Sequence, residues 1–396
     1  MESKNNRKKL LFNIMPKSYL FTIISLLASI VTYGNDYPVL ASGSSLEPAD
    51  SKDINIEVKE EILTIRLTDE TNVAKPYGEN EGTFYNTKAY VDVDYTFYNH
   101  GEATDMLVAF VAYFPSTNRF LDNIFDGSPY IHDFTVEVNG QSQPVTTSVP
   151  GLPKNYKQEL LKVEYGHLIY EGKYIWEYLY AFPAKFVKGE NKVHHTYSYD
   201  LCPSFNLWNL EYALSPASHW KGGKIGKFTL RVECPNTAKH FYVNCEDLQN
   251  VSPIFTKGVG KQRKSPRYSG NREISMRDAV AQWTMYEYSP KSRLDIYSVV
   301  LRYVDEYDTE DYPCGYSYDR TLGFRPSWGK LSGQPRILRN MPYAHRGYVF
   351  KTKEMKKIFE KLWWYIPDST YVPDMSDFTE RELEFINGTY KEKKEE

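Results

Sequence analysis

Strict alternation of apolar and polar side chains is the most constraining pattern in this sequence. In residues 90–97 the odd-numbered positions hold Val, Val, Tyr and Phe, whereas most even-numbered positions are polar. Because successive side chains of a β-strand point to opposite faces, this pattern predicts a strand with one buried and one solvated face. The same alternation recurs in residues 228–234 and 241–245. Two packed antiparallel sheets, a β-sandwich, would bury one face of each strand.

Turn signals and breaks in the pattern separate these strands. Asn139-Gly140 follows an alternating run, and both residues tolerate the positive φ of a type I′ hairpin. After residues 54–58 the apolar phase changes at Glu60-Glu61, which predicts two short strands. Residues 257–272 hold six basic side chains, no acidic one, three glycines and a proline. They predict an exposed basic loop, either a contact for phosphate or carboxylate groups or a solvated insertion.

The amino-terminal residues are predicted to be an export signal. Five basic residues precede the uncharged segment 20–31, and a polar segment with small residues follows. Twelve helical residues span about 18 Å, which is short of the about 30 Å hydrocarbon core of a bilayer. We therefore expect residues 1–41 to be a signal peptide. The mature chain is expected to be exported, periplasmic or extracellular, and not membrane-spanning.

Export would place the four cysteines, at positions 202, 234, 245 and 314, where disulfides persist. If residues 235–240 formed a hairpin turn, Cys234 and Cys245 would lie too far apart along the ladder to be bridged. We expect no bond between these two. Buried free thiols remain the alternative to any disulfide pairing.

Length and charge limit the classes of function. A chain of 396 residues exceeds one compact core, so two domains are expected. With 48 basic and 51 acidic residues the chain has no strong field to gather nucleic acid, and no nucleic-acid partner is expected. No zinc-helix, paired-cysteine, nucleophile-elbow, P-loop or dinucleotide motif occurs. No catalytic residue, metal ligand or cofactor is therefore predicted.

Two groups of polar residues within the alternating region are candidate sites. His194 and His195 are adjacent on a strand, so their imidazoles would point to opposite faces and could not share a metal. Only His194 with Asp200 remains as a ligand pair. Asp92 and Asp94 share a strand face and would resemble a glycosidase carboxylate pair. Acidic residues on the wet face of a sheet are the alternative interpretation.

The segments VHHTYSYDL (193–201), HWKGGKIGKFTL (219–230), VNCEDLQNVSP (243–253) and SPKSRLDIY (289–297) resemble an uncharacterised family of exported bacterial domains. The resemblance covers about residues 50–300. It implies a sandwich of bacterial origin. That family has no assigned activity, so the resemblance assigns no catalytic residue.

The last eighty residues have helical periodicity instead. Apolar residues at 355, 358, 359 and 362 predict an amphipathic helix from Lys353 to about Trp363, with its lysines in water. Thr379 with Glu382 forms a capping box for a second helix. An acidic stretch in residues 305–311 predicts the connector to this unit.

This unit resembles the YARHG domain, a bacterial extracytoplasmic module. Its motif appears as Tyr343-Ala344-His345-Arg346-Gly347, with His and Arg exchanged relative to the family order. The other matching residues are Leu338, Arg339, Asn340, Tyr348, Phe350, Phe359, Trp364, Tyr365, Pro367, Glu384 and Asn387. On a helix the exchange rotates each of the two side chains by about 100°. Pro342 is a second departure, expected to kink a helix.

Together these observations predict an α+β protein with a signal peptide (1–41), an antiparallel β-sandwich (50–304), a linker (305–324) and a YARHG-like domain (325–392). The resemblance implies a module of the cell envelope whose partner is a cell-wall polymer or surface glycan, or another envelope protein. Aromatic rings can stack on sugars and arginine can pair with anions. The candidate ligand-binding residues are Arg339, Tyr343, His345, Arg346, Trp363, Trp364 and Tyr365.

Three hypotheses follow. The first is an exported, non-enzymatic protein whose sandwich presents the binding module. The second is a hydrolase of cell-wall or surface glycan that uses His345, Arg346 or the Asp92/Asp94 pair. The third is a structural subunit of an exported assembly. For the aromatic cluster, a purely structural role as the core of a small domain is the alternative to binding.

Overall fold

The computed structural model describes residues 41–49, 54–71, 85–113, 124–128, 130–164, 167–201, 209–264, 271–298, 335–378, 383 and 386–389. The predicted signal peptide, except Ala41, lies outside these residues. The predicted linker, Cys202 and Cys314 also lie outside them.

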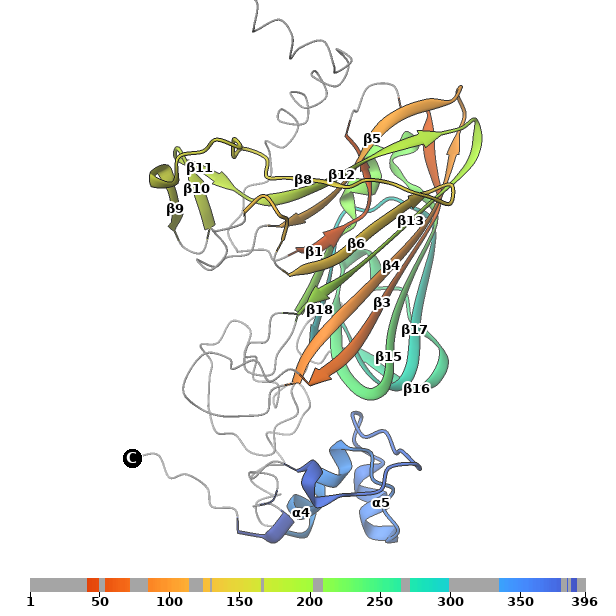
Figure 1. Ribbon diagram of the computed structural model, residues 1–396. Coiled ribbons are helices and arrows are strands. Elements are labelled where there is room, and N and C mark those ends of the chain that lie inside the picture. Colours follow the sequence, from red (N-terminus) through yellow and green to blue (C-terminus); the bar gives the residue numbers. More distant parts are fainter. Residues whose placement is uncertain are drawn as a thin grey trace, which may run out of the picture.

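Eleven strands form one large, twisted, mixed sheet (Figure 1). Their order is β1-β14-β18-β15-β3-β4-β13-β6-β7, while β17 pairs with β15 and β16 pairs with β17. All pairs are antiparallel except β1–β14 and β15–β3. The strands are β1 (Ala41–Ser44), β3 (Ile56–Thr71), β4 (Tyr85–Asn99), β6 (Ile131–Val138), β7 (Gln141–Ser142), β13 (Gly189–Asp200), β14 (Asn209–Ala213), β15 (Ile225–Asn244), β16 (Ile254–Lys264), β17 (Arg272–Tyr288) and β18 (Arg293–Ser298).

Two smaller sheets accompany it. A four-stranded sheet has the order β2-β5-β12-β8 and a three-stranded sheet the order β11-β10-β9. Their strands are β2 (Glu47–Pro48), β5 (Thr104–Tyr113), β8 (Thr146–Ser148), β9 (Leu161–Glu164), β10 (His167–Tyr170), β11 (Lys173–Ile175) and β12 (Glu177–Phe186). Short 3₁₀ turns are η2 (Gln158–Leu160), η3 (Ser215–His219), η4 (Lys221–Gly223), η5 (Glu246–Leu248) and η6 (Met375–Asp377).

The main core lies between the large sheet and the four-stranded sheet. The predicted inward residues of β4, including Val93 and Phe97, are fully buried, whereas Asp92 and Asp94 on its other face are exposed. β12 contributes Tyr178 and Phe182 to the same core cluster. The predicted α+β architecture, a β-rich body followed by a small helical module, is therefore confirmed.

The change of apolar phase near Glu60 has a different cause from the one predicted. β3 is one continuous strand, and its pairing with β4 shifts register between Val58 and Glu60. Such a bulge inserts one residue and moves the following side chains to the other face. The prediction of two short strands is wrong because a bulge and a strand break leave the same mark in a sequence.

Residues 235–240 do not form a hairpin turn, because β15 runs without a break from Ile225 to Asn244. A register shift against β17, between Cys234 and Ala238, accounts for the interrupted alternation. Cys234 and Cys245 are both buried and are not joined to each other, as predicted. The Asn139-Gly140 hairpin is present between β6 and β7, with φ values of 51° and 75°.

The predicted basic loop is also corrected. Residues 254–264 form β16, which pairs with β17 over two register shifts, and residues 265–270 lie outside the described part of the chain. The glycines at 258 and 260 fit close backbone and ring contacts within the strand pair: a side chain at Gly258 would meet the Asp278 carbonyl, and one at Gly260 the Phe255 ring. Glycine in a strand often marks a bulge or a close approach, as it does here.

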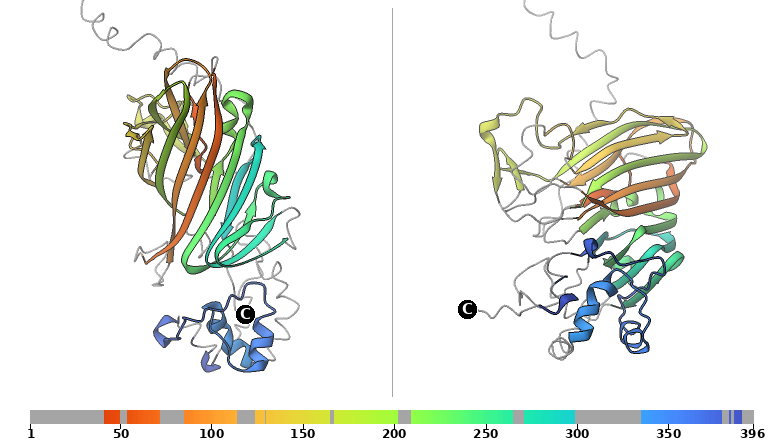
Figure 2. Two further views of the ribbon diagram at one scale, coloured as in Figure 1. Left: turned by 90° about the vertical axis from the view of Figure 1, so that its right-hand side faces the viewer. Right: turned by 60° about the horizontal axis from the view of Figure 1, so that its bottom comes forward.

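The C-terminal module, residues 335–389 as described, lies at one end of the large sheet (Figures 1 and 2). It contains α4 (Pro335–His345), which includes Pro342, and α5 (Lys353–Phe359), which ends earlier than the predicted Trp363. Its own buried cluster includes Met341, Phe350 and Phe359. Thr379 and Glu382 of the predicted capping box lie outside the described residues, but Leu383, Ile386 and Asn387 are helical.

Among the helices of the described residues, none has both the length and the apolar character needed to cross a lipid bilayer.

Candidate functional site

The C-terminal module contacts the large sheet near one end, on side chains of β15, β16 and β17. We call this surface the docking face; its residues are His240, Lys261, Arg263, Ser275 and Arg277. Cross-strand register places His240 and Lys261 opposite Ser275, so the three side chains share one face. The Ser275 hydroxyl is within hydrogen-bond distance of His240 Nδ1, at 2.9 Å.

The module contacts this face through the segment Trp363–Asp368. Ser275 donates a hydrogen bond to the Trp364 carbonyl at 3.2 Å. Lys261 Nζ donates to the Tyr365 carbonyl at 2.7 Å. The Arg263 guanidinium lies over the Trp363 ring, 4.3 Å from its centroid. The two hydrogen bonds provide donors for backbone carbonyls in the turn segment that follows α5.

An ion pair completes the contact. Arg277 and Asp368 approach to 3.2 Å, and their side chains are only 14% and 20% exposed. Burial lowers the pKa of Arg277, and the charge of Asp368 opposes this change. Burial would raise the pKa of Asp368, but hydrogen bonds from Thr370 and the nearby Arg277 charge hold it below its usual value. Both groups therefore stay charged at neutral pH.

The aromatic candidates belong to the module's own core: the rings of Trp364 and Tyr365 are part of its buried cluster, and Trp363 packs against that cluster. Trp364 and Tyr365 are each 2% exposed, and Trp363 is half-buried beneath Arg263. The Tyr365 hydroxyl donates to the Tyr348 carbonyl at 2.7 Å. The rings of Trp364 and Tyr365 are thus closed within the module, while their carbonyls and the Trp363 ring meet the sheet.

The other candidates lie on and beside α4. The half-buried Tyr343 ring meets Phe378 edge to face at 4.9 Å. The Arg346 guanidinium lies over the same Phe378 ring at 4.3 Å and donates to the Pro342 carbonyl. Arg339 is exposed and adjoins Gly388. His345 ends α4, and its side chain lies outside the described part of the chain.

A row of lysines lies on the solvent side of the module. Lys353 and Lys357 are one helical turn apart on α5, and Lys351 and Lys361 flank the helix. All four are exposed, and none has an ion-pair partner among the described residues. We call them the lysine row. On the same helix Lys356 faces Glu360 at 3.8 Å, and Arg336 of α4 pairs with Glu354.

The second group of predicted side chains lies on the solvent face of β4 and β13. His194 Nε2 is 3.3 Å from Asp92, and one ligand atom each of Asp92, Asp94 and His194 falls within 4.8 Å of the others. Asp200 instead pairs with His132 at 2.7 Å, so the predicted His194–Asp200 pair does not form. His195 is fully buried, on the opposite face from His194, as predicted.

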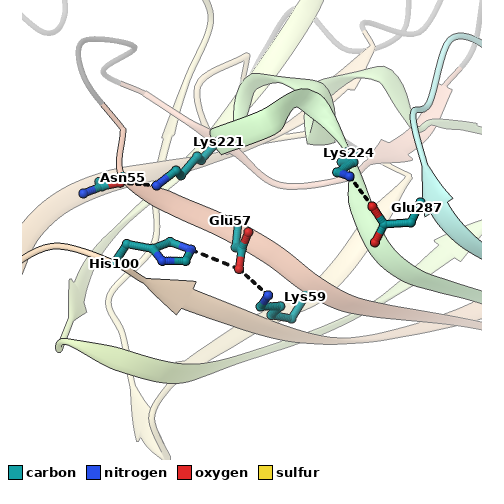
Figure 3. A network of polar contacts seen from close by, with 7 residues as sticks. All are labelled: Asn55, Glu57, Lys59, His100, Lys221, Lys224 and Glu287. Atoms are coloured by element: carbon teal, nitrogen blue, oxygen red, sulfur yellow. Dashed lines mark hydrogen bonds and ion pairs between the residues drawn. The ribbon is translucent and has the colours of Figure 1, made fainter.

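Figure 3 shows a further polar network around the start of β3 and β15. Glu57 accepts from both His100 and Lys59, Lys221 donates to Asn55, and Lys224 pairs with Glu287. His100 lies 3.0 Å from Glu57. The pairs link η4 and the ends of neighbouring strands, so the network holds the sheet end together.

Sequence reasoning missed the docking face and the lysine row as functional surfaces. Arg277 and Asp368 are 91 residues apart, and no local pattern marks two charges as partners over that distance. The lysines were predicted to face water, but only as the polar side of a helix. The spacing of α5 gave no signal that these lysines lack ion-pair partners, because Glu354 and Glu360 lie three residues on either side of Lys357.

Comparisons with known proteins give one family match and similar solved structures. Residues 331–391 match the YARHG domain model. No match was found among curated proteins. A crystal structure from Legionella pneumophila, of a protein proposed to bind nutrients, is similar over 90% of this chain and 100% of its own, with 19% identity and a TM-score of 0.50. At that identity it supports the fold alone.

A zinc metallopeptidase of the M1 family from Deinococcus radiodurans is similar over 61% of this chain and 42% of its own, at 10% identity. Its TM-score of 0.26 is too low to carry an argument. The module that docks on the large sheet through its tryptophans is thus the part of the chain that matches a known family, the YARHG domain.

Proposed function

We propose that this chain is an exported, non-enzymatic binding protein of the bacterial cell envelope. In this proposal the sandwich holds the C-terminal module in a fixed orientation, and the module binds an anionic cell-wall or surface polymer. The YARHG match and the resemblance in fold to a proposed nutrient-binding protein support a binding role. The sequence of residues 1–41 supports export, to the periplasm or the cell exterior.

The observation that carries the proposal is the orientation of the module. The segment 363–365 meets the sheet through two carbonyls and the Trp363 ring, whereas the lysine row is exposed. Four exposed ammonium groups that form no ion pair among the described residues attract phosphates and carboxylates, the charges that envelope polymers carry. Arg339, which is exposed on α4, would add a fifth cation. Trp363, Trp364 and Tyr365 would then act by orienting the module.

The test is retention of the mature chain on purified cell-wall material and on an immobilised polyphosphate. A variant with Lys351, Lys353, Lys357 and Lys361 changed to Gln should lose at least tenfold in retention. Binding by the native chain should weaken as salt rises, because screening acts on exposed charges. Retention that is the same in the fourfold variant and does not weaken as salt rises would contradict the proposal.

A matched control removes the same number of positive charges from the sandwich instead of the module. Lys154, Lys185, Lys264 and Lys291 are also exposed and are distant in sequence from the module. Their fourfold change to Gln should leave retention within about twofold of the native chain, whereas an equal loss would show a non-specific effect of net charge.

A glycan hydrolase remains a second candidate, favoured by the group Asp92, Asp94 and His194. Two carboxylates and an imidazole within 4.8 Å form an arrangement in which one group can relay a proton to another. A clearing band in a zymogram of wall substrate, lost in Asp94→Asn, would support it. A mature chain that yields no band over the range of about pH 5–8, where imidazole titrates, would count against it.

A further inference from the structure

A pair of stacked aromatic side chains lies exposed on the three-stranded sheet. Tyr174 of β11 and Trp176, which follows it, have ring centroids 5.1 Å apart and planes inclined by 29°. Tyr174 is 46% exposed and Trp176 47% exposed, whereas Ile175 between them is 1% exposed. We call Tyr174 and Trp176 the aromatic pair. The sheet stands at the end of β8 and β12, away from the C-terminal module (Figure 1).

The strand pattern explains why both rings face outward. Ile175 pairs with Leu168 of β10, and both are buried in the main core. Tyr174 pairs with Ile169, whose other neighbour is Lys162 of β9, so these side chains share the outer face. Trp176 lies two residues beyond Tyr174 and therefore beside it on that face.

The aromatic pair is held on a rigid element. β10 and β11 are joined by the two-residue turn Glu171-Gly172, whose φ values of 49° and 76° are those of a type I′ hairpin. The inward residues of all three strands anchor the sheet to the core. Two preformed rings lose little conformational entropy when a ligand stacks on them.

We propose that the aromatic pair is a stacking platform for an uncharged saccharide. The apolar C–H face of a pyranose ring matches the electron-rich face of an indole or phenol ring. The hydroxyl rim of the sugar needs polar neighbours, and Lys162, Glu171 and Lys173 are exposed around the pair. This goes beyond the polyanion site of the module, because both the surface and the ligand chemistry differ.

The size of the patch favours a sugar over a membrane. Ile169, the apolar residue beside the rings, is only 8% exposed, and charged residues border the patch. Insertion into a bilayer needs a wider apolar surface bordered by cations, whereas two rings suffice for one or two sugar residues. A membrane is therefore an outcome to be tested and not the proposal.

The test measures binding of two uncharged probes, the β-1,4 tetramer of N-acetylglucosamine and cellotetraose, by calorimetry and tryptophan fluorescence. The native mature chain should bind at least one probe with a Kd on the order of 0.1–1 mM, since few contacts are made. Trp176→Ala should weaken binding at least tenfold and Tyr174→Ala about fivefold, which correspond to about 1.4 and 1 kcal/mol. Trp176→Phe should restore part of the affinity.

The matched control is Tyr286→Ala. Tyr286 is 71% exposed on β17, and no stacked ring neighbours it among the described residues, so its loss should leave saccharide binding unchanged. The fourfold change of the lysine row should also leave it unchanged, which separates this proposal from the proposed function. An unchanged thermal transition in Trp176→Ala would show that the variant folds.

Three results would overturn the proposal. The first is no binding of either probe up to about 10 mM, well above the expected Kd. The second is an equal loss in Tyr286→Ala. The third is retention on vesicles of phosphatidylglycerol and phosphatidylethanolamine that depends on Trp176 while neither sugar binds, which would assign the aromatic pair to a membrane surface.

Discussion

The sandwich and the C-terminal module differ in what they bury. In the sandwich, Glu61 is fully buried and its Oε1 accepts hydrogen bonds from the Ser45 and Tyr95 hydroxyls. His195 is fully buried among aromatic rings, and neither ring nitrogen has a hydrogen-bond partner among the described residues. In the module, by contrast, the buried side chains that the structure describes are apolar or aromatic.

Size explains this difference. A core shared by two sheets gains enough from apolar burial to tolerate a few ionisable groups, each of which costs several kcal/mol when charged. A module of about sixty residues has no such margin. Its charged residues therefore lie outside its core, as Asp368 does at the contact with the sheet. We expect sandwich stability to depend on pH, and module stability to depend on packing and on docking.

The largest expected effect is acid destabilisation of the sandwich through His195. Burial lowers the pKa of His195 from 6.5 to about 3. Between these pH values the His195 imidazole stays neutral in the folded chain but takes up a proton in the unfolded chain. The free energy of unfolding should therefore fall as the pH drops from 6.5 to 3, by about 5 kcal/mol for this group alone. His195→Phe should remove this dependence in denaturant titrations followed by fluorescence.

The control is His194→Gln, on the solvent face of the same strand. It should leave the acid dependence as it is in the native chain, because it keeps the buried imidazole of His195. If His195→Phe kept the full acid dependence, burial of this imidazole would not be its cause.

The next effect concerns module packing. Phe359 is fully buried and stacks on Phe350 with centroids 4.4 Å apart. Phe359→Ala should cost about 4 kcal/mol, enough to unfold a small module while the sandwich stays folded. Limited proteolysis should then yield a stable fragment that ends before residue 335. Val372→Ala, at an 82% exposed position, is the matched control and should leave the native digestion pattern. Loss of the sandwich as well would show that the two parts unfold together.

A smaller effect of the opposite sign concerns Glu61. Burial raises its pKa from 4.5 to about 7, while the Ser45 and Tyr95 hydrogen bonds oppose the rise. The folded chain thus keeps a proton that the unfolded chain releases, and the free energy of unfolding should fall by about 3 kcal/mol as the pH rises from 4.5 to 7. Relative to the native chain, Glu61→Gln should raise the free energy of unfolding more at pH 7 than at pH 4.5. For Glu61 and His195 alone, the two opposite pH dependences cancel between about pH 4.5 and 6.5.

Burial also raises the pKa values of Glu177 and Glu211 to about 7, so Glu61→Gln should remove only part of the dependence near neutrality. Glu60→Gln changes the neighbouring residue, which pairs with Lys227 at the sheet surface, and is the matched control. Equal pH profiles for both variants would contradict the role of Glu61.

Only part of the contrast between the sandwich and the C-terminal module could be predicted from the sequence. Alternation in β4 predicted which face is buried, because the period of a strand is a local property. The bulges in β3 and β15 were misread, since a shift of one residue looks like a strand end. Helical spacing predicted α5 and its lysines, and motif spacing predicted the module itself.

The placement of the aromatic residues could not be predicted in this way. Residues 363–365 and the aromatic pair have similar composition, yet the first group is covered and the second is open. Trp364 and Tyr365 are covered by the module's own core, and Trp363 is covered by Arg263, 100 residues away in the chain. Only the paired topology of β15, β16 and β17 brings Arg263, together with Lys261 and Ser275, to this segment.

The last and smallest effect tests the joint between the two parts. Arg277 and Asp368 are largely buried, so a charge-assisted hydrogen bond between them should contribute about 2 kcal/mol to docking. Arg277→Met should leave both parts folded but increase exchange of amide hydrogens in residues 273–277 and 363–368. Asp368→Asn should have the same effect, and the double variant should add little, because the two residues share one interaction.

The matched control for this pair is Lys356→Met, which breaks an exposed ion pair of the module with Glu360. The Lys356 and Glu360 side chains are 58% and 51% exposed. The change should therefore alter the free energy of unfolding by less than about 0.5 kcal/mol and leave amide hydrogen exchange at the joint unchanged. Arg277 and Asp368 both stay charged between about pH 5 and 8, so their ion pair should persist over this range. An equal rise of exchange in Lys356→Met would show that the loss of any charge of the module loosens the joint, and unchanged exchange in Arg277→Met and Asp368→Asn would show that the other contacts hold the module without this pair.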